Sequence, residues 1–182
     1  MTGLKSVLRE AGRRVRQGVA PSASGALVEV VLGSELIPTG VVVGGFWPLA
    51  GEVDLRALLA VLVGRGQVVL LPETPELGFP LVFRHWTPGV TMVAERFGTM
   101  RPEGAVGVPD LLLVPLLAFD AGCNRLGYGG GYYDRTIAGL PGVRTIGCAF
   151  SVQQVDAVPV LPHDRAMDAV VTERGVIMRP ES

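Results

Sequence analysis

The chain has 182 residues, of which 48% are hydrophobic, and a formal net charge of −1 at pH 7. That length can bury a sizeable core, and we expect a single domain over residues 1–182. The balanced charge gives no global basic field for nucleic acid, and the longest apolar runs, 41–50 and 111–119, fall short of the roughly 18–20 residues that cross a bilayer.

Cysteine and histidine are scarce. Cys123 and Cys148 have the spacing of neither a metal site nor a disulfide framework, and His85 and His163 lie far apart in the chain. Two such cysteines are typical of reduced thiols in the cytoplasm, and the N-terminus lacks the apolar stretch of a signal peptide. We therefore expect a cytoplasmic protein without a zinc site and without nucleic-acid or membrane partners. A monomer is the default expectation, because the sequence does not indicate the oligomeric state.

The first half of the chain alternates helical and strand-like patterns. Apolar residues near helical spacing predict helices over 4–19, 24–36 and 54–63. Short apolar runs predict strands over 41–46, 67–71 and 81–85, the last more polar and nearer an edge. A strand, a helix and a strand in this order form a βαβ unit, which predicts a parallel sheet.

The second half has a less regular beginning. We expect a loop over 72–80, and over 87–107 either a flap above a site or a surface connection. The most apolar strand covers 110–119, and a glycine-rich loop follows it. The remaining predicted elements are a helix over 132–138 and strands over 144–150 and 169–172, with 176–178 pairing with the last.

Residues 125–135, Arg-Leu-Gly-Tyr-Gly-Gly-Gly-Tyr-Tyr-Asp-Arg, are the most informative segment. Its four glycines in five positions leave a backbone whose N–H groups can curl toward an anion. Arg125 and Arg135 flank it with guanidinium groups suited to phosphate, and Asp134 supplies an oxygen ligand of the kind that Mg²⁺ takes. The segment suggests an ATP–magnesium site beside an aromatic wall. A flexible turn is the alternative, because the spacing matches neither standard phosphate motif.

Basic residues recur along the first predicted helix. Lys5, Arg9 and Arg13 follow one another at four-residue spacing and therefore share one helix face. A solvated basic stripe is the ordinary interpretation of such a pattern, and a phosphate-binding face is the functional one. Lys5 is the only lysine in the sequence, so its substitution tests lysine chemistry directly.

The segment 110–140, D-L-L-L-V-P-L-L-A-F-D-A-G-C-N-R-L-G-Y-G-G-G-Y-Y-D-R-T-I-A-G-L, strongly resembles the 5-formyltetrahydrofolate cyclo-ligase family, also called 5,10-methenyltetrahydrofolate synthetase. Other landmarks follow the family's order over nearly the whole chain. They are Lys5-x-x-x-Arg9, Phe46-Trp47-Pro48, Gly51-Glu52-Val53-Asp54, Phe83-Arg84-x-Trp86, His163-Asp164 and Asp168-x-x-x-Thr172-Glu173.

The resemblance implies a three-layer αβα fold with a mostly parallel central sheet, as in sugar-phosphate isomerases and coenzyme A transferases. It implies that ATP and 5-formyltetrahydrofolate give 5,10-methenyltetrahydrofolate, ADP and phosphate, with Mg²⁺ as cofactor. The γ-phosphoryl group activates the formyl oxygen and N10 closes the ring, so catalysis is mainly alignment and charge neutralisation. Two other functions are the alternatives. The chain could be a non-enzymatic relative that binds folate or nucleotide, or a phosphotransferase that acts on another substrate.

The resemblance also implies site residues. Those for ATP are Lys5, Arg9, Arg125, Leu126, Gly127, Tyr128, Gly129, Gly130, Gly131, Tyr132 and Tyr133. Those for folate are Trp47, Glu52, Phe97, Tyr132 and Tyr133, and those for Mg²⁺ are Asp134 and Asp168. From the residues alone, Glu52 and Asp134 could instead be charges at helix starts, Trp47 could fill the core, and Asp168 could be a solvated acid at a strand edge.

One position departs from the family pattern, and a second is one at which the family itself varies. The family commonly has Gly where this chain has Leu116, which could narrow the pocket or shift the loop. The family has either Gly or Lys at position 130, and this chain has Gly. More of the phosphate neutralisation would then fall on Lys5, Arg9 and Arg125.

Overall fold

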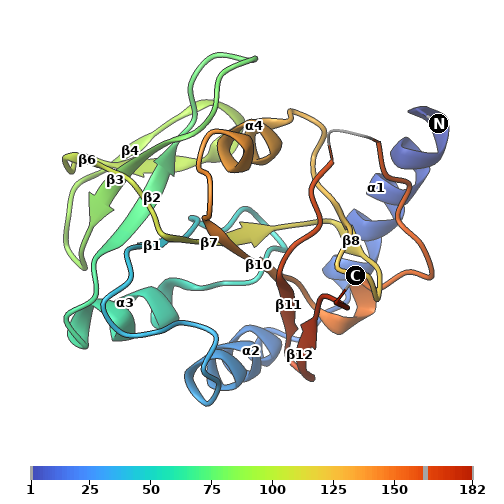
Figure 1. The fold of residues 1–182 in the computed structure, drawn as a ribbon, viewed down its shortest axis with the longest axis horizontal. Helices are drawn as coiled ribbons and strands as arrows, with labels where there is room; N and C mark the ends of the chain where they lie inside the picture. The colour runs from blue at the N-terminus through green and yellow to red at the C-terminus, as the bar shows by residue number, and fades with distance from the viewer. Residues whose placement is uncertain (1, 162–163, 182) are drawn as a thin grey trace.

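The computed structural model describes residues 2–161 and 164–181, and a sheet of eight strands forms its centre (Figure 1). The strands lie in the order β12-β11-β10-β7-β1-β2-β3-β6. Their bounds are β1 Val43–Gly44, β2 Val69–Glu73, β3 Val82–Trp86, β6 Val106–Gly107, β7 Leu111–Pro115, β10 Arg144–Cys148, β11 Ala169–Thr172 and β12 Gly175–Met178. The contiguous strands from β11 to β2 are parallel, which confirms the predicted mostly parallel sheet.

Helices cover both faces of this sheet. The covering helices are α2 (Ser22–Leu32), α3 (Arg56–Gly64) and α4 (Tyr132–Ala138), and a further helix, α1 (Thr2–Gln17), lies beyond the sheet. Successive side chains of a strand point to opposite faces, so Leu111 and Leu113 of β7 pack with α2 and α3, whereas Leu112 packs in the cluster that Ile137 of α4 covers. Figure 1 shows α2 and α3 on one side and α4 on the other, the predicted three-layer αβα arrangement. Among the described residues, none of the helices is both long and apolar enough for a membrane span.

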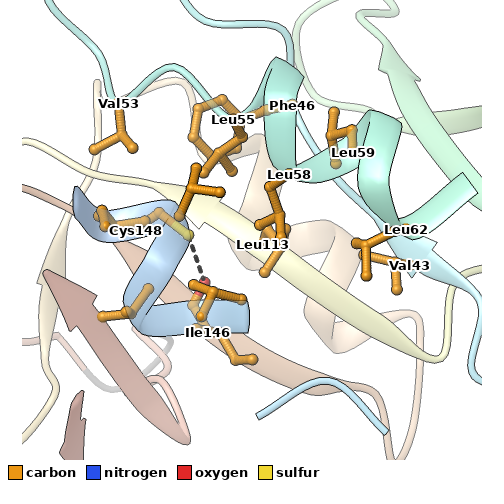
Figure 2. Packing of buried hydrophobic residues seen from close by; sticks show 14 of the residues in the cluster. Val43, Phe46, Val53, Leu55, Leu58, Leu59, Leu62, Leu113, Ile146 and Cys148 are labelled. Carbon is orange, nitrogen blue, oxygen red and sulfur yellow. Dashed lines mark hydrogen bonds between the residues drawn. The ribbon is translucent and has the colours of Figure 1, made fainter. Parts of the chain in front are cut away.

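The core between α3 and the sheet is made of aliphatic side chains. Leu58 and Leu62 of α3 are buried, and Figure 2 shows Leu58 beside Leu113 of β7 and Leu62 beside Val43 of β1. Full burial of such a side chain contributes about 1.5–3 kcal/mol. This packing holds β1 and β7 in the middle of the sheet.

Helix α1 packs on a small hairpin at one end of the sheet. The hairpin consists of β8 (Ala118–Phe119) and β9 (Arg125–Leu126), and Leu8 of the helix packs against its apolar side chains. The approach is close, because a Cβ added at Gly12 would lie 2.3 Å from the Leu117 carbonyl oxygen. The hairpin leads directly into the glycine-rich loop, so α1 lies beside that loop.

Several predicted boundaries are wrong. The strand predicted over 41–46 is the two-residue β1, and the helix predicted over 24–36 ends before Gly33. The strand predicted over 110–119 is two strands, because the chain leaves the sheet after Pro115 to form the hairpin with β9. The segment 87–107 is more regular than predicted, since it contains β4 (Met92–Ala94), β5 (Met100–Pro102) and β6.

The substitution Leu59→Ala is expected to lower the free energy of unfolding by about 2–5 kcal/mol, because it removes a fully buried side chain and leaves a cavity. Val61→Ala lies in the same helix at a side chain 37% exposed, and should change that free energy by less than about 0.5 kcal/mol. Urea denaturation followed by circular dichroism measures both variants. Equal losses would contradict the placement of Leu59 in the core.

Candidate functional site

A cavity of about 860 Å³ opens at the carboxyl ends of the central strands. Phe46 follows β1, Thr74 follows β2 and Pro115 ends β7, and all three line the cavity. β1 lies between β2 and β7, so the chain order reverses across it. Such a switch point is where open α/β sheets bind ligands, and the volume is within the roughly 300–1,000 Å³ of ligand pockets.

The structure brings nearly all of the predicted site residues to this one cavity. Those that line it are Lys5, Arg9, Trp47, Glu52, Phe97, Arg125, Leu126, Gly127, Tyr128, Gly129, Gly130, Gly131, Tyr132, Tyr133 and Asp134. They come from α1, the segments after β1 and β4, and the glycine-rich loop, which are far apart in the sequence. The roles that the family resemblance implies for them stay predictions.

Asp168 does not lie with the other predicted metal ligand. Its carboxylate accepts hydrogen bonds from the Thr145 backbone N–H (2.8 Å) and hydroxyl (3.0 Å), and pairs with Arg179 (3.1 Å). Asp168 precedes β11, which is parallel to the central strands, so it lies at the edge opposite their carboxyl ends. Asp164 lines the cavity instead. His163, its neighbour in the family landmark, lies outside the described residues.

Ion pairs hold the charged wall of the cavity in place. Lys5 Nζ lies 2.6 Å from Asp164 Oδ2, with the two side chains only 12% and 17% exposed. Arg125 Nη2 lies 2.7 Å from Asp134 Oδ1, and Arg125 also donates to the Arg165 carbonyl. Each mostly buried charge therefore has an opposite charge in contact, as burial requires.

The glycine-rich loop is held by two arginines from outside it. Arg9 Nε donates to the Gly127 carbonyl at 2.9 Å, and Arg135 Nη2 donates to the Gly130 carbonyl at 2.7 Å. Gly129 has a φ of 100° and Gly131 a φ of 67°, which favour glycine. Arg135 does not line the cavity, so the prediction that it flanks a bound phosphate is not supported.

Glu52 is the buried carboxylate of the cavity. It ends a turn in which Gly51 has a φ of 77°, and its Oε2 accepts the Leu49 N–H at 2.8 Å. Its Oε1 accepts a hydrogen bond from the Tyr128 hydroxyl, and Arg16 Nη1 lies 3.8 Å away. The glutamate side chain is only 4% exposed, so a ligand can reach it only by replacing one of these partners.

Arg16 does not line the cavity but contacts two residues that do, Tyr128 and Glu52, and the sequence analysis did not predict these contacts. Its Nη1 donates to the Tyr128 hydroxyl at 2.8 Å, while its buried Nε has no hydrogen-bond partner among the described residues. A buried donor left without a partner costs about 1–3 kcal/mol. The signal was present, because Arg16 lies seven residues after Arg9 and therefore on the same helix face.

Aromatic side chains form the remaining walls. Trp47 lines the cavity with the Arg56 guanidinium 5.4 Å from its ring, and the Tyr132 hydroxyl donates to the Pro75 carbonyl. Burial raises the pKa of Tyr133 well above the usual range of a phenol. Phe97, between β4 and β5, is 68% exposed and has a φ of 63°, a conformation that costs free energy in a non-glycine residue.

Leu116 is not among the residues that line the cavity, so the alternative in which it narrows the pocket is not supported. Its side chain is buried in the core on the α4 face, and a Cβ added at Gly147 would lie 2.7 Å from its Cδ2. The glycine at 147 thus makes room for the leucine at 116. Other cavity-lining residues that were not predicted as ligands include Arg13, Thr74, Thr99, Met100 and Asp164.

Comparisons with known proteins agree on one family. Residues 3–173 match the sequence model of the 5-formyltetrahydrofolate cyclo-ligase family. A 5-formyltetrahydrofolate cyclo-ligase of Mycolicibacterium smegmatis is 34% identical, over 97% of this chain and 93% of its own length. One from Escherichia coli is 35% identical, over 72% and 77%. The NMR structure of a 5,10-methenyltetrahydrofolate synthetase from Aquifex aeolicus superposes with a TM-score of 0.82 at 28% identity, over 98% of this chain and 94% of that one.

Gly129→Ala is expected to destabilise the protein by about 1–3 kcal/mol, because a side chain is disfavoured at its φ of 100°. The new Cβ would also lie 3.2 Å from the Arg9 guanidinium carbon. Gly127→Ala is the matched control, since a Cβ there meets no atom within 4 Å, and should cost less than about 0.5 kcal/mol. Chemical denaturation of both variants measures the difference, and a loss as large at Gly127 would refute this account of the loop.

Proposed function

The chain belongs to the 5-formyltetrahydrofolate cyclo-ligase family, and on that premise we propose how its cavity carries out the ATP-dependent reaction. The protein is an ATP-dependent ligase that converts 5-formyltetrahydrofolate to 5,10-methenyltetrahydrofolate. We propose that residues 1–182 act as one domain and as a cytoplasmic monomer. One observation supports the mechanism most strongly: the basic face of α1, the glycine-rich loop and Glu52 all line the same cavity.

The phosphate end of the site lies between α1 and the glycine-rich loop. Lys5 and Arg9 from the helix and Arg125 from the start of the loop supply positive charge on the cavity wall. The loop N–H groups add donors, which backbones rich in glycine can direct toward an anion. Gly130 leaves no loop lysine, so these three side chains carry most of the neutralisation of the ATP phosphates.

Asp134 and Asp164 are the carboxylates suited to Mg²⁺. Both line the cavity, and both contact the cations expected to bind phosphate, Arg125 and Lys5. Among the described residues no three acidic, cysteine or histidine side chains gather as metal ligands. Water and phosphate oxygens would therefore complete the coordination, as is usual for Mg²⁺. Bound there, Mg²⁺ would neutralise charge on the β- and γ-phosphates.

The folate end of the site contains the aromatic residues and Glu52. A carboxylate can accept paired N–H bonds from the 2-aminopyrimidine edge of a pterin, and Glu52 is the buried carboxylate of this wall. Trp47 and Phe97 offer flat surfaces to the rings. Tyr132 and Tyr133 follow the glycine-rich loop at the start of α4 and would lie between the nucleotide and the folate.

This placement accounts for the chemistry. The formyl oxygen is a poor leaving group until it takes the γ-phosphoryl group of ATP, which releases ADP. N10 then attacks the activated formyl carbon and loses its proton, the C–O bond breaks, and phosphate departs as the ring closes. Lys5, Arg9 and Arg125 stabilise the phosphoryl charge, and Glu52 holds the pterin so that N10 and the formyl carbon stay aligned.

The assay that tests this function follows the near-ultraviolet absorbance of the methenyl product with and without Mg·ATP. Lys5→Met should lower kcat/KM by about 10²–10³-fold, because it removes a preorganised charge from the transferring phosphoryl group. Arg14→Met is the control, at an exposed side chain of the same helix that pairs with Glu10, and should stay within about twofold. Folded protein that binds folate yet forms no product would instead indicate a non-enzymatic binding relative.

A second pair of variants separates the two candidate metal ligands. Asp164→Asn should lower kcat/KM by about 100-fold or more and raise the Mg²⁺ concentration needed for half-maximal rate. Asp168→Asn should leave both within about twofold, because its carboxylate binds Thr145 and Arg179 away from the cavity. Magnesium titrations of the initial rate decide between them. The reverse ranking would return the metal site to Asp168.

A further inference from the structure

The hydroxyl of Tyr128 is hydrogen-bonded to Glu52, the carboxylate that the proposed function assigns to the pterin. It donates to Glu52 Oε1 and accepts a hydrogen bond from Arg16 Nη1 at 2.8 Å. Burial, together with the nearby negative charge of Glu52, raises the pKa of Tyr128 well above the usual range of a phenol. The hydroxyl therefore stays protonated and donates to Glu52, as an N–H of a pterin would.

Tyr128 belongs to the nucleotide loop as well as to the folate wall. It lies between Gly127 and Gly129, the latter with a φ of 100°, so its two neighbours in the loop carry no side chains. The loop is held from α1 through Arg9, which donates to the Gly127 carbonyl and lies against Gly129. Arg9 is also one of the cations expected to bind the ATP phosphates.

These contacts connect the two ends of the cavity. Arg9 bonds the Gly127 carbonyl through Nε, so a phosphate that draws the guanidinium toward itself would weaken this bond and loosen the loop next to Tyr128. Arg16 stays behind with its unpartnered Nε and a second nitrogen 3.8 Å from Glu52, so it can hold the carboxylate after Tyr128 leaves. Departure of Tyr128 therefore exposes Glu52 without leaving its charge unpaired.

We propose that Tyr128 is a positioning residue that competes with the pterin for Glu52, so that nucleotide bound at the glycine-rich loop raises the affinity of the cavity for folate. The inference rests on the proposed function, because it takes Glu52 as the pterin ligand. The coupling is reciprocal, so folate raises the affinity for nucleotide by the same factor.

Calorimetric titration with 5-formyltetrahydrofolate, with and without a non-hydrolysable Mg·ATP analogue, tests the coupling. Wild-type protein should bind folate about tenfold more tightly when the analogue is present. Tyr128→Phe keeps the ring and removes the hydroxyl, so it should bind folate about tenfold more tightly than wild type without nucleotide. The analogue should then add little, less than about twofold.

Ser34→Ala is the control for loss of a hydroxyl away from the cavity. The Ser34 hydroxyl donates to the Val31 carbonyl and does not line the cavity, so the ratio of the two folate affinities should remain as in wild type. The same ratio of folate affinities in wild type and Tyr128→Phe would overturn the role proposed for Tyr128 while leaving the proposed function intact. Wild-type protein that neither binds folate nor forms the methenyl product would overturn both.

Discussion

The close packing of α1 on the β8–β9 hairpin is the contact upon which the site depends. At Gly12 the helix backbone approaches the Leu117 carbonyl so closely that a Cβ would overlap it, and Leu8 packs into the hairpin beside it. These contacts set the rotation of the helix about its axis. With that rotation Lys5 and Arg9 face the cavity, and the Arg16 guanidinium lies 3.8 Å from the Glu52 carboxylate. A larger residue at position 12 would move every cation of the helix together.

Charge balance is the second organising feature. Four cations and three carboxylates line the described part of the cavity: Lys5, Arg9, Arg13, Arg125, Glu52, Asp134 and Asp164. In the structure they neutralise one another through the pairs of Lys5 with Asp164 and Arg125 with Asp134. When Mg·ATP binds, its phosphates would pair with these cations and its metal with these carboxylates. Each side chain would then exchange its present partner for a ligand, and few charges would be left unpaired. The side chains are already desolvated and oriented, so less reorganisation is needed when Mg·ATP binds.

Local patterns were enough to predict most of the helices and strands. The helix over 132–138 and the strand over 169–172 have the predicted bounds, because each follows a clear turn and a compact apolar pattern. Strand ends were less predictable. The apolar run 110–119 continues past the point where the chain leaves the sheet, since hydrophobicity does not distinguish a strand in the sheet from a strand in the hairpin that packs on it.

The sequence by itself determined the family, the parallel sheet and which residues make up the glycine-rich loop. The sheet follows from the periodicity of apolar residues, and the family and the loop follow from one contiguous motif. The tertiary structure decided which distant side chains meet. Strand direction sends Asp168 to the far edge of the sheet, while Asp164 lines the cavity, although four positions separate them. Helix rotation places Arg16 against Tyr128 and Glu52. Such contacts depend on how elements pack in space, and no short-range pattern in the chain encodes that packing.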